Sequence, residues 1–80
     1  MSQHGLIVHA EWDAEARVWV ATSDDVPGLV TEADTVEALE AKLRVMIPEL
    51  LDLNAHTLAG KVDLPVNLIA TKREWMALHT

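Results

Sequence analysis

The sequence predicts an α+β domain in which a small antiparallel sheet carries one main helix on one face. Three observations support this fold class. The first part of the chain alternates apolar and polar residues with a period of two, as strands do. Residues 36–53 repeat apolar side chains every three or four positions, as an amphipathic helix does. A second alternating stretch follows, so the predicted element order is β-β-β-α-β.

Two strands joined by a hairpin begin the predicted fold. They cover residues 5–12 and 17–23, with a polar four-residue connection between them. The even-numbered residues of the first strand, Trp12 among them, form its core-facing side. We expect the uncovered side of the sheet to be too apolar to remain exposed to water. The residues expected there are Ile7, His9, Trp19 and Ala21, with Ile69 of the last strand as a further candidate.

A Pro-Gly turn separates the hairpin from the third strand. Pro27 and Gly28 suit positions i+1 and i+2 of a type II turn, in which Gly28 takes a positive φ. A short strand is predicted at residues 29–33. Either Asp34 or Thr35 can then cap the free N–H groups of the helix.

The second half of the chain contains the helix, a loop and a last strand. Pro48 lies inside the helical pattern, so we expect a kink or a break, and the apolar stripe beyond it favours a kink. Residues 54–63 are predicted as a loop and residues 64–71 as the last strand. A short terminal helix is expected at about residues 72–79, where Trp75 could anchor it.

Size and composition predict one globular domain over residues 1–80, with its core at about residues 5–71. In a chain this small, the burial energy is close to the entropic cost of folding, so we expect a homo-oligomer. There is no cysteine, which excludes disulfides and thiolate sites and favours the cytoplasm. The N-terminus resembles neither a signal peptide nor a membrane anchor, so no membrane partner is expected.

The charge pattern favours a protein partner over a nucleic acid. The net charge is −7, and the six Lys and Arg residues are scattered along the chain. Phosphate backbones require clustered cations, so direct nucleic-acid binding is not expected. An acidic surface suits a basic protein partner, while acidity that only maintains solubility is the alternative.

No sequence motif indicates catalysis or cofactor binding. The four histidines form no metal-ligand pair, neither serine lies in a nucleophile motif, and the three glycines form no phosphate loop. Carboxylates at strand ends could hold Mg²⁺, but turn and capping roles explain them better, because no motif of fixed spacing supports a metal site. We therefore predict no catalytic, cofactor-binding or metal-binding residues.

Residues 18–39 carry a family resemblance. A strand ends in Asp24-Asp25, a Val-Pro-Gly turn follows, a short strand contains Glu32, and Asp-Thr opens a helix. This run resembles the N-terminal domain of HicB-type antitoxins, and the preceding hairpin also matches. The resemblance implies a fold similar to a truncated RNase H fold. It further implies binding to small basic HicA-type toxins, which cleave messenger RNA.

We therefore predict a non-enzymatic HicB-like interaction domain that could neutralise a HicA-type toxin by occluding its RNA-binding face. The candidate partner-binding residues are Asp13, Glu15, Asp24, Asp25 and Glu32, with Trp19 as the apolar anchor. Two alternatives remain open at this stage. One is a metal-dependent RNase H-like nuclease, which needs at least three carboxylates converging in one pocket. The other is a stand-alone oligomeric module whose partner is unknown.

Overall fold

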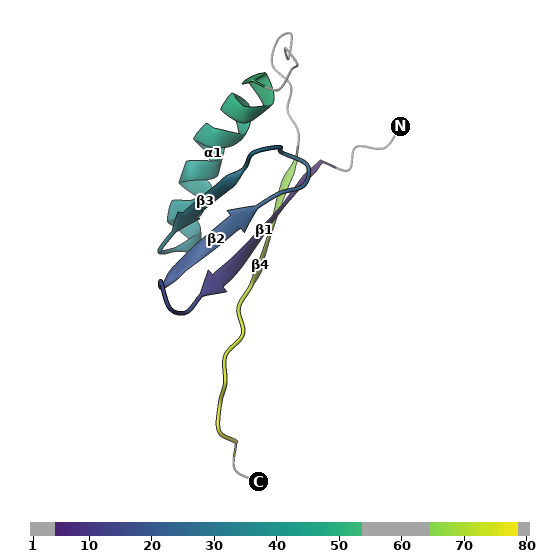
Figure 1. The fold of residues 1–80 in the computed structure, drawn as a ribbon. Helices are drawn as coiled ribbons and strands as arrows, with labels where there is room; N and C mark the ends of the chain where they lie inside the picture. The colour runs from purple at the N-terminus through teal and green to yellow at the C-terminus, as the bar shows by residue number, and fades with distance from the viewer. Residues whose placement is uncertain (1–4, 54–64, 79–80) are drawn as a thin grey trace.

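A computed structural model of the chain describes residues 5–53 and 65–78. Four strands form one sheet in the order β3-β2-β1-β4, and one helix packs across one face of it (Figure 1). The elements are β1 Leu6–Asp13, β2 Val18–Thr22, β3 Val30–Ala33, α1 Val36–Leu53 and β4 Val66–Thr71. This arrangement confirms the α+β class and the β-β-β-α-β order. The predicted loop at residues 54–63 lies outside the described residues.

The sheet is mixed, so the prediction of an antiparallel sheet is wrong for its last strand. β4 pairs in parallel with β1, from Leu6 opposite Val66 to Glu11 opposite Thr71. The two antiparallel pairings of β2 give β3 the same direction as β1. α1 then carries the chain back along the sheet, as a parallel crossover requires, and β4 starts at the end where β1 starts.

The register between β1 and β2 corrects the predicted position of two residues. Trp12 lies opposite Trp19, and Ala10 lies opposite Ala21. Cross-strand partners share a face, so Trp19 and Ala21 lie on the helix side and not on the uncovered side. The physical reason is the length of the hairpin loop, residues 14–17. A loop with an even number of residues pairs even-numbered residues of one strand with odd-numbered residues of the next.

The core lies between the sheet and α1. Three small residues of the sheet allow the helix to come close, and larger aliphatic side chains fill the remaining space. The buried residues are Val8, Ala10, Ala21, Val26, Leu29, Ala33, Leu39, Leu43 and Ile47. At the start of α1, Thr35 Oγ1 accepts a hydrogen bond of 3.0 Å from the N–H of Ala38, so Thr35 acts as the N-cap. α1 continues through Pro48 without the break considered above.

The chain after β4 is extended, so the predicted terminal helix is wrong. Residues 72–78 have no regular secondary structure and are exposed throughout. A helix this short is stable only when an apolar face packs against the fold, and these residues have no such packing in one copy of the chain. Within the described residues, no helix is long and apolar enough to cross a bilayer.

Replacing Gly28 tests the turn before β3. The N–H of Leu29 donates to the Val26 carbonyl at 3.1 Å and Gly28 has a φ of 86°, as a type II turn requires. We expect Gly28→Val to lower the free energy of unfolding by about 1 kcal/mol or more, because a β-branched residue is strained there. Gly28→Asn should cost less, since asparagine tolerates this region. Equal thermal midpoints for Gly28→Val and the wild type would contradict the turn.

Replacing Gly5 tests the attachment of β4. Gly5 has a φ of 73°, and a Cβ atom there would meet the Pro65 carbonyl oxygen and lie 2.7 Å from Pro65 Cγ. At Gly28 a Cβ atom would have ordinary contacts, 3.7 Å from Leu50 Cδ2. We therefore expect Gly5→Ala to cost about 2 kcal/mol or more and Gly28→Ala about 1 kcal/mol, measured by urea unfolding. Equal losses would show that β4 does not depend on this close approach.

Candidate functional site

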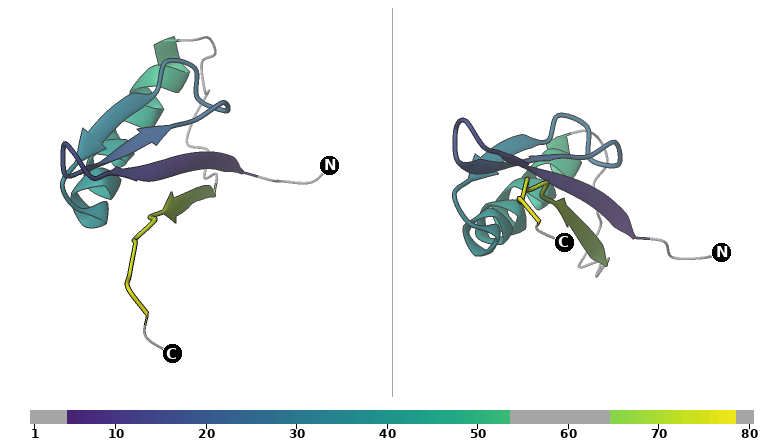
Figure 2. Two further views of the ribbon diagram at one scale, coloured as in Figure 1. Left: turned by 60° about the horizontal axis from the view of Figure 1, so that its bottom comes forward. Right: turned by 90° about the horizontal axis from the view of Figure 1, so that it is seen from below.

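Among residues 5–53 and 65–78, no helix covers the face of the sheet opposite α1, as both views in Figure 2 show. We call it the outer face. The alternation of the strands and their register assign its residues. They are Ile7, His9, Glu11, Asp13, Val18, Val20, Thr22, Val30, Glu32, Asn67, Ile69 and Thr71.

Acidic and aliphatic side chains dominate the outer face. Glu11 and Glu32 flank Val20, because both residues lie opposite it in the sheet. The strand residues described on this face include no Lys or Arg. Exposed aliphatic side chains are also present, with Val30 68% and Ile69 45% exposed. The face therefore offers negative charge together with apolar contact area.

One end of the outer face carries a small hollow beside the β2–β3 loop. It has a volume of about 160 Å³ and is lined by Ile7, His9, Asp24 and Asp25. Asp25 Oδ2 accepts the N–H of Ile7 at 2.8 Å, so this carboxylate also fixes the loop to β1. Ser23 strengthens the attachment, since its Oγ donates to the Ile7 carbonyl at 2.6 Å and accepts the Asp25 N–H at 3.0 Å. We call this site the loop hollow.

A second hollow lies at the β1–β2 hairpin. It has a volume of about 370 Å³, and its lining residues are Glu11, Trp12, Asp13, Ala14, Glu15 and Val20. Asp13 Oδ1 accepts the N–H groups of Glu15 and Ala16, at 3.1 and 3.2 Å, and so shapes the hairpin. In the part of the chain that the structure describes, no three His, Asp or Glu side chains are placed to share a metal ion. We call this site the hairpin hollow.

The structure brings the five predicted acidic residues to one side of the molecule, but not to one point. Asp13 and Glu15 line the hairpin hollow, and Asp24 and Asp25 line the loop hollow. Glu32 lies on the outer face in β3, opposite Val20. Sequence reasoning missed Glu11 as a member of this site. The signal was available, because Glu11 alternates in step with His9 along the first strand.

Trp19, the predicted apolar anchor, lies on the other side of the sheet. Its ring is edge-on to that of Trp12, with centroids 5.4 Å apart, and it packs against the core. It therefore cannot serve the outer face. The exposed aliphatic residues of the outer face take its place as the candidate apolar contacts. Of the four histidines, His9 is the one within the described residues.

Comparison with known proteins gives a family without an assigned activity. Residues 5–80 match the family described as "Domain of unknown function (DUF1902)". The crystal structure of a hypothetical protein from the extremely thermophilic bacterium Thermus thermophilus is similar, with 53% sequence identity and a TM-score of 0.66. That similarity covers 91% of this chain and 97% of the other. No curated protein matches this sequence.

Proposed function

Since the chain belongs to the DUF1902 family of domains of unknown function, we propose a role from the chemistry of its own surface. The domain acts as a non-enzymatic protein-interaction module, similar to HicB-type antitoxins, in the cytoplasm. Its partner is a small basic protein of the HicA toxin type. By covering the face with which that toxin binds messenger RNA, the domain keeps the RNA out. The acidic outer face is the observation that carries this proposal.

Charge complementarity supports a basic partner. An RNA-binding face presents clustered Lys and Arg side chains. The outer face presents Glu11, Asp13 and Glu32, and each of its two hollows is lined by further carboxylates. Opposite potentials of this kind raise the association rate and fix the orientation of two partners. Cationic side chains of the partner can enter the hollows and bring their N–H donors to the carboxylates.

The spacing of the two hollows sets a requirement for the partner. His9 lines the loop hollow and Asp13 lines the hairpin hollow, and both residues lie on β1. Four residues along a strand span about 13 Å. A partner with two cationic groups at about that separation can engage both hollows at once. Ile69 beside His9 and Val30 on the far edge then supply the contact that excludes water.

The proposal also includes self-association of the chain. Several large apolar side chains of the described residues stay exposed in a single copy, well beyond those on the outer face. An exposed apolar surface of that extent is typical of an interaction site.

Kinetic measurements on a charge-reversal variant test the toxin-binding role. The partner to test is the product of the adjacent reading frame, expected to be a small basic protein. Asp24→Lys should slow association about tenfold at low salt, and the effect should shrink as salt rises. Asp24 is preferred to Asp25, whose carboxylate holds the Ile7 N–H.

The matched control is Glu49→Lys, which makes the same charge change at an exposed position of α1. It should leave the association rate within about twofold of the wild type. Equal slowing by both variants would assign the effect to net charge and contradict a role of the outer face. Absence of binding to any such basic protein would remove the antitoxin role.

The alternative function is a metal-dependent nuclease, because three carboxylates, Glu11, Asp13 and Glu15, line the hairpin hollow. We expect the purified chain to leave RNA intact in Mg²⁺ or Mn²⁺, since a shared metal ion needs carboxylates that converge within coordination distance. A cleavage assay with labelled RNA measures this. Metal-dependent cleavage that is lost in Glu11→Gln but kept in Glu49→Gln would replace the proposed function by the alternative.

A further inference from the structure

The chain after β4 carries its apolar side chains into solvent. Residues 72–78, which we call the C-terminal arm, extend away from the sheet (Figures 1 and 2). Trp75, Met76 and Leu78 are 88%, 72% and 83% exposed. Such side chains are normally buried or form an interface, and tryptophan is especially common at the centre of interfaces. Within the described residues, the first part of the arm forms a hollow with Trp12, Ala14 and Arg17, yet its three apolar side chains stay exposed and are available to a partner.

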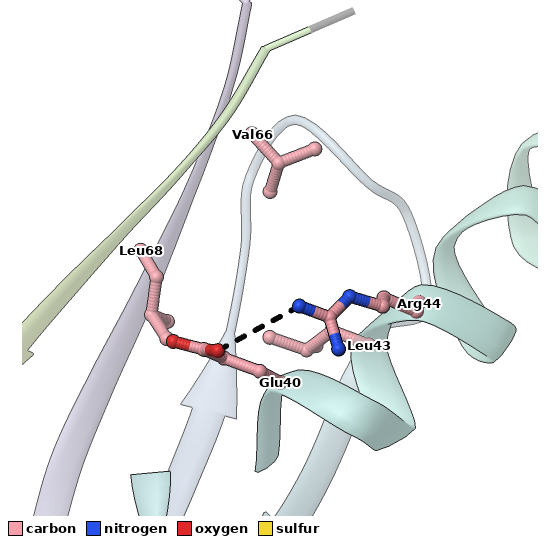
Figure 3. A pocket seen from close by; sticks show the side chains of 5 residues that line it. All are labelled: Glu40, Leu43, Arg44, Val66 and Leu68. Atoms are coloured by element: carbon pink, nitrogen blue, oxygen red, sulfur yellow. Dashed lines mark ion pairs between the residues drawn. The ribbon is translucent and has the colours of Figure 1, made fainter. Parts of the chain in front are cut away.

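An apolar groove lies between α1 and β4. It has a volume of about 210 Å³ and is lined by Leu43, Val66 and Leu68, with Glu40 and Arg44 at its rim (Figure 3). Glu40 and Arg44 form an exposed ion pair of 3.9 Å across one helical turn. Within the described residues, β4 is an edge strand of the sheet, next to β1, and it borders the groove.

The arm does not occupy the groove of its own chain, whose lining residues lie on α1 and β4. The groove lies at the start of β4, and Val66 and Thr71 are about 17 Å apart along the strand. To reach Val66 within its own copy, the chain would have to reverse its direction directly after Thr71, whereas residues 72–78 are extended and lead away from the groove (Figure 1). Such a reversal would also break a cation–π contact, in which Lys72 Nζ lies 4.7 Å from the centroid of the Trp12 ring. This contact holds the first residue of the arm in the direction in which β4 runs.

We infer that two copies of the chain exchange their C-terminal arms, each arm occupying the α1–β4 groove of the other copy. This inference rests on the self-association included in the proposed function and is independent of toxin binding. In a two-fold arrangement the β4 edges lie antiparallel. The residues after Thr71 of one copy then lie beside the start of β4 in the other copy, where Val66 lines the groove.

The charge of the C-terminal arm and the surface area that it can bury both suit its binding in the groove of the second copy. The arm contains two cations and one carboxylate, whereas α1 contains four carboxylates and two cations. Each Trp75 ring can bury about 150–250 Å². Two arms, the grooves they cover and the strand edges between them can reach the total of about 1,200 Å² typical of stable dimers.

Sedimentation of full-length variants tests the arm exchange. We expect the wild type to form a species of twice 8.8 kDa at micromolar concentration. The triple variant Trp75→Ser, Met76→Ser, Leu78→Ser should raise the dimer dissociation constant tenfold or more. The matched control is Val30→Ser with Val45→Ser, which removes two aliphatic side chains that are 68% and 59% exposed outside the arm and the groove. It should dimerise like the wild type.

A second pair of variants tests the groove. Val66→Glu and Val45→Glu make the same substitution at two exposed valines, one on β4 and one on α1, which are 44% and 59% exposed. Val66 lines the groove and Val45 lies outside both the groove and β4, so Val66→Glu alone should weaken the dimer. Circular dichroism of both variants confirms that they fold.

Disulfide trapping identifies the chain that supplies the arm, since the sequence has no cysteine of its own. A mixture of Val66→Cys and Met76→Cys chains should form a disulfide-linked heterodimer on mild oxidation. Ile69→Cys mixed with Met76→Cys should form far less. A doubly substituted Val66→Cys, Met76→Cys chain that closes an internal disulfide as a monomer would overturn the exchange.

The outcomes separate the two proposals. A monomeric wild type overturns self-association and the arm exchange together. A dimeric wild type whose triple arm variant keeps an unchanged dissociation constant overturns the arm exchange and leaves self-association standing. A dimer that is lost in the arm and Val66 variants but kept in both controls supports the exchange.

Discussion

The pairing of β1 with β2 determines which side of the sheet receives the helix. Asp13 closes the hairpin, since its carbonyl accepts the N–H of Arg17 at 2.7 Å and its side chain accepts two further N–H groups. Arg17 completes the turn with a φ of 61°. Ala10 then faces Ala21 under α1, where two methyl groups leave room for the larger side chains of the helix. A hairpin loop one residue longer or shorter would reverse this arrangement.

The same pairing places carboxylates of β1 on the outer face, and the described cations lie elsewhere in the fold. Glu11 and Asp13 are directed to the outer face, while the described cations lie on α1, at the hairpin and in the arm. Lys42 illustrates this, since its Nζ reaches the Glu32 carbonyl at the β3 edge from the helix side, at 2.6 Å. The outer face and the α1–β4 groove therefore differ in chemistry. The proposed basic partner and the proposed arm exchange therefore use different surfaces, and the two proposed interactions would not compete.

The crossover through α1 explains why β4 is both an edge strand and the base of the arm. The chain leaves β3 at one edge of the sheet and returns at the other, beside β1. The close approach of Gly5 to Pro65 and the hydrogen bond of 2.9 Å from the Leu6 N–H to the Pro65 carbonyl set the start of this pairing. Because β1 ends at Asp13 and turns back into the hairpin, residues 72–78 continue past the sheet.

The sequence by itself determined the order and type of the elements, the positive φ of Gly28 and the presence of a helix cap, because periodicity and turn chemistry act over a few residues. It also identified acidic residues that line the two hollows. The face of Trp19 follows from the even length of the hairpin loop, a local feature that the sequence analysis did not use. Only the tertiary structure decided the direction of β4 and the extended form of residues 72–78. Both features depend on contacts between residues that are far apart in the chain, and a pattern of neighbouring residues does not reveal such contacts. Asp24 and Asp25 line the loop hollow together with His9 for the same reason. The fold places the β2–β3 loop beside β1, which comes earlier in the chain.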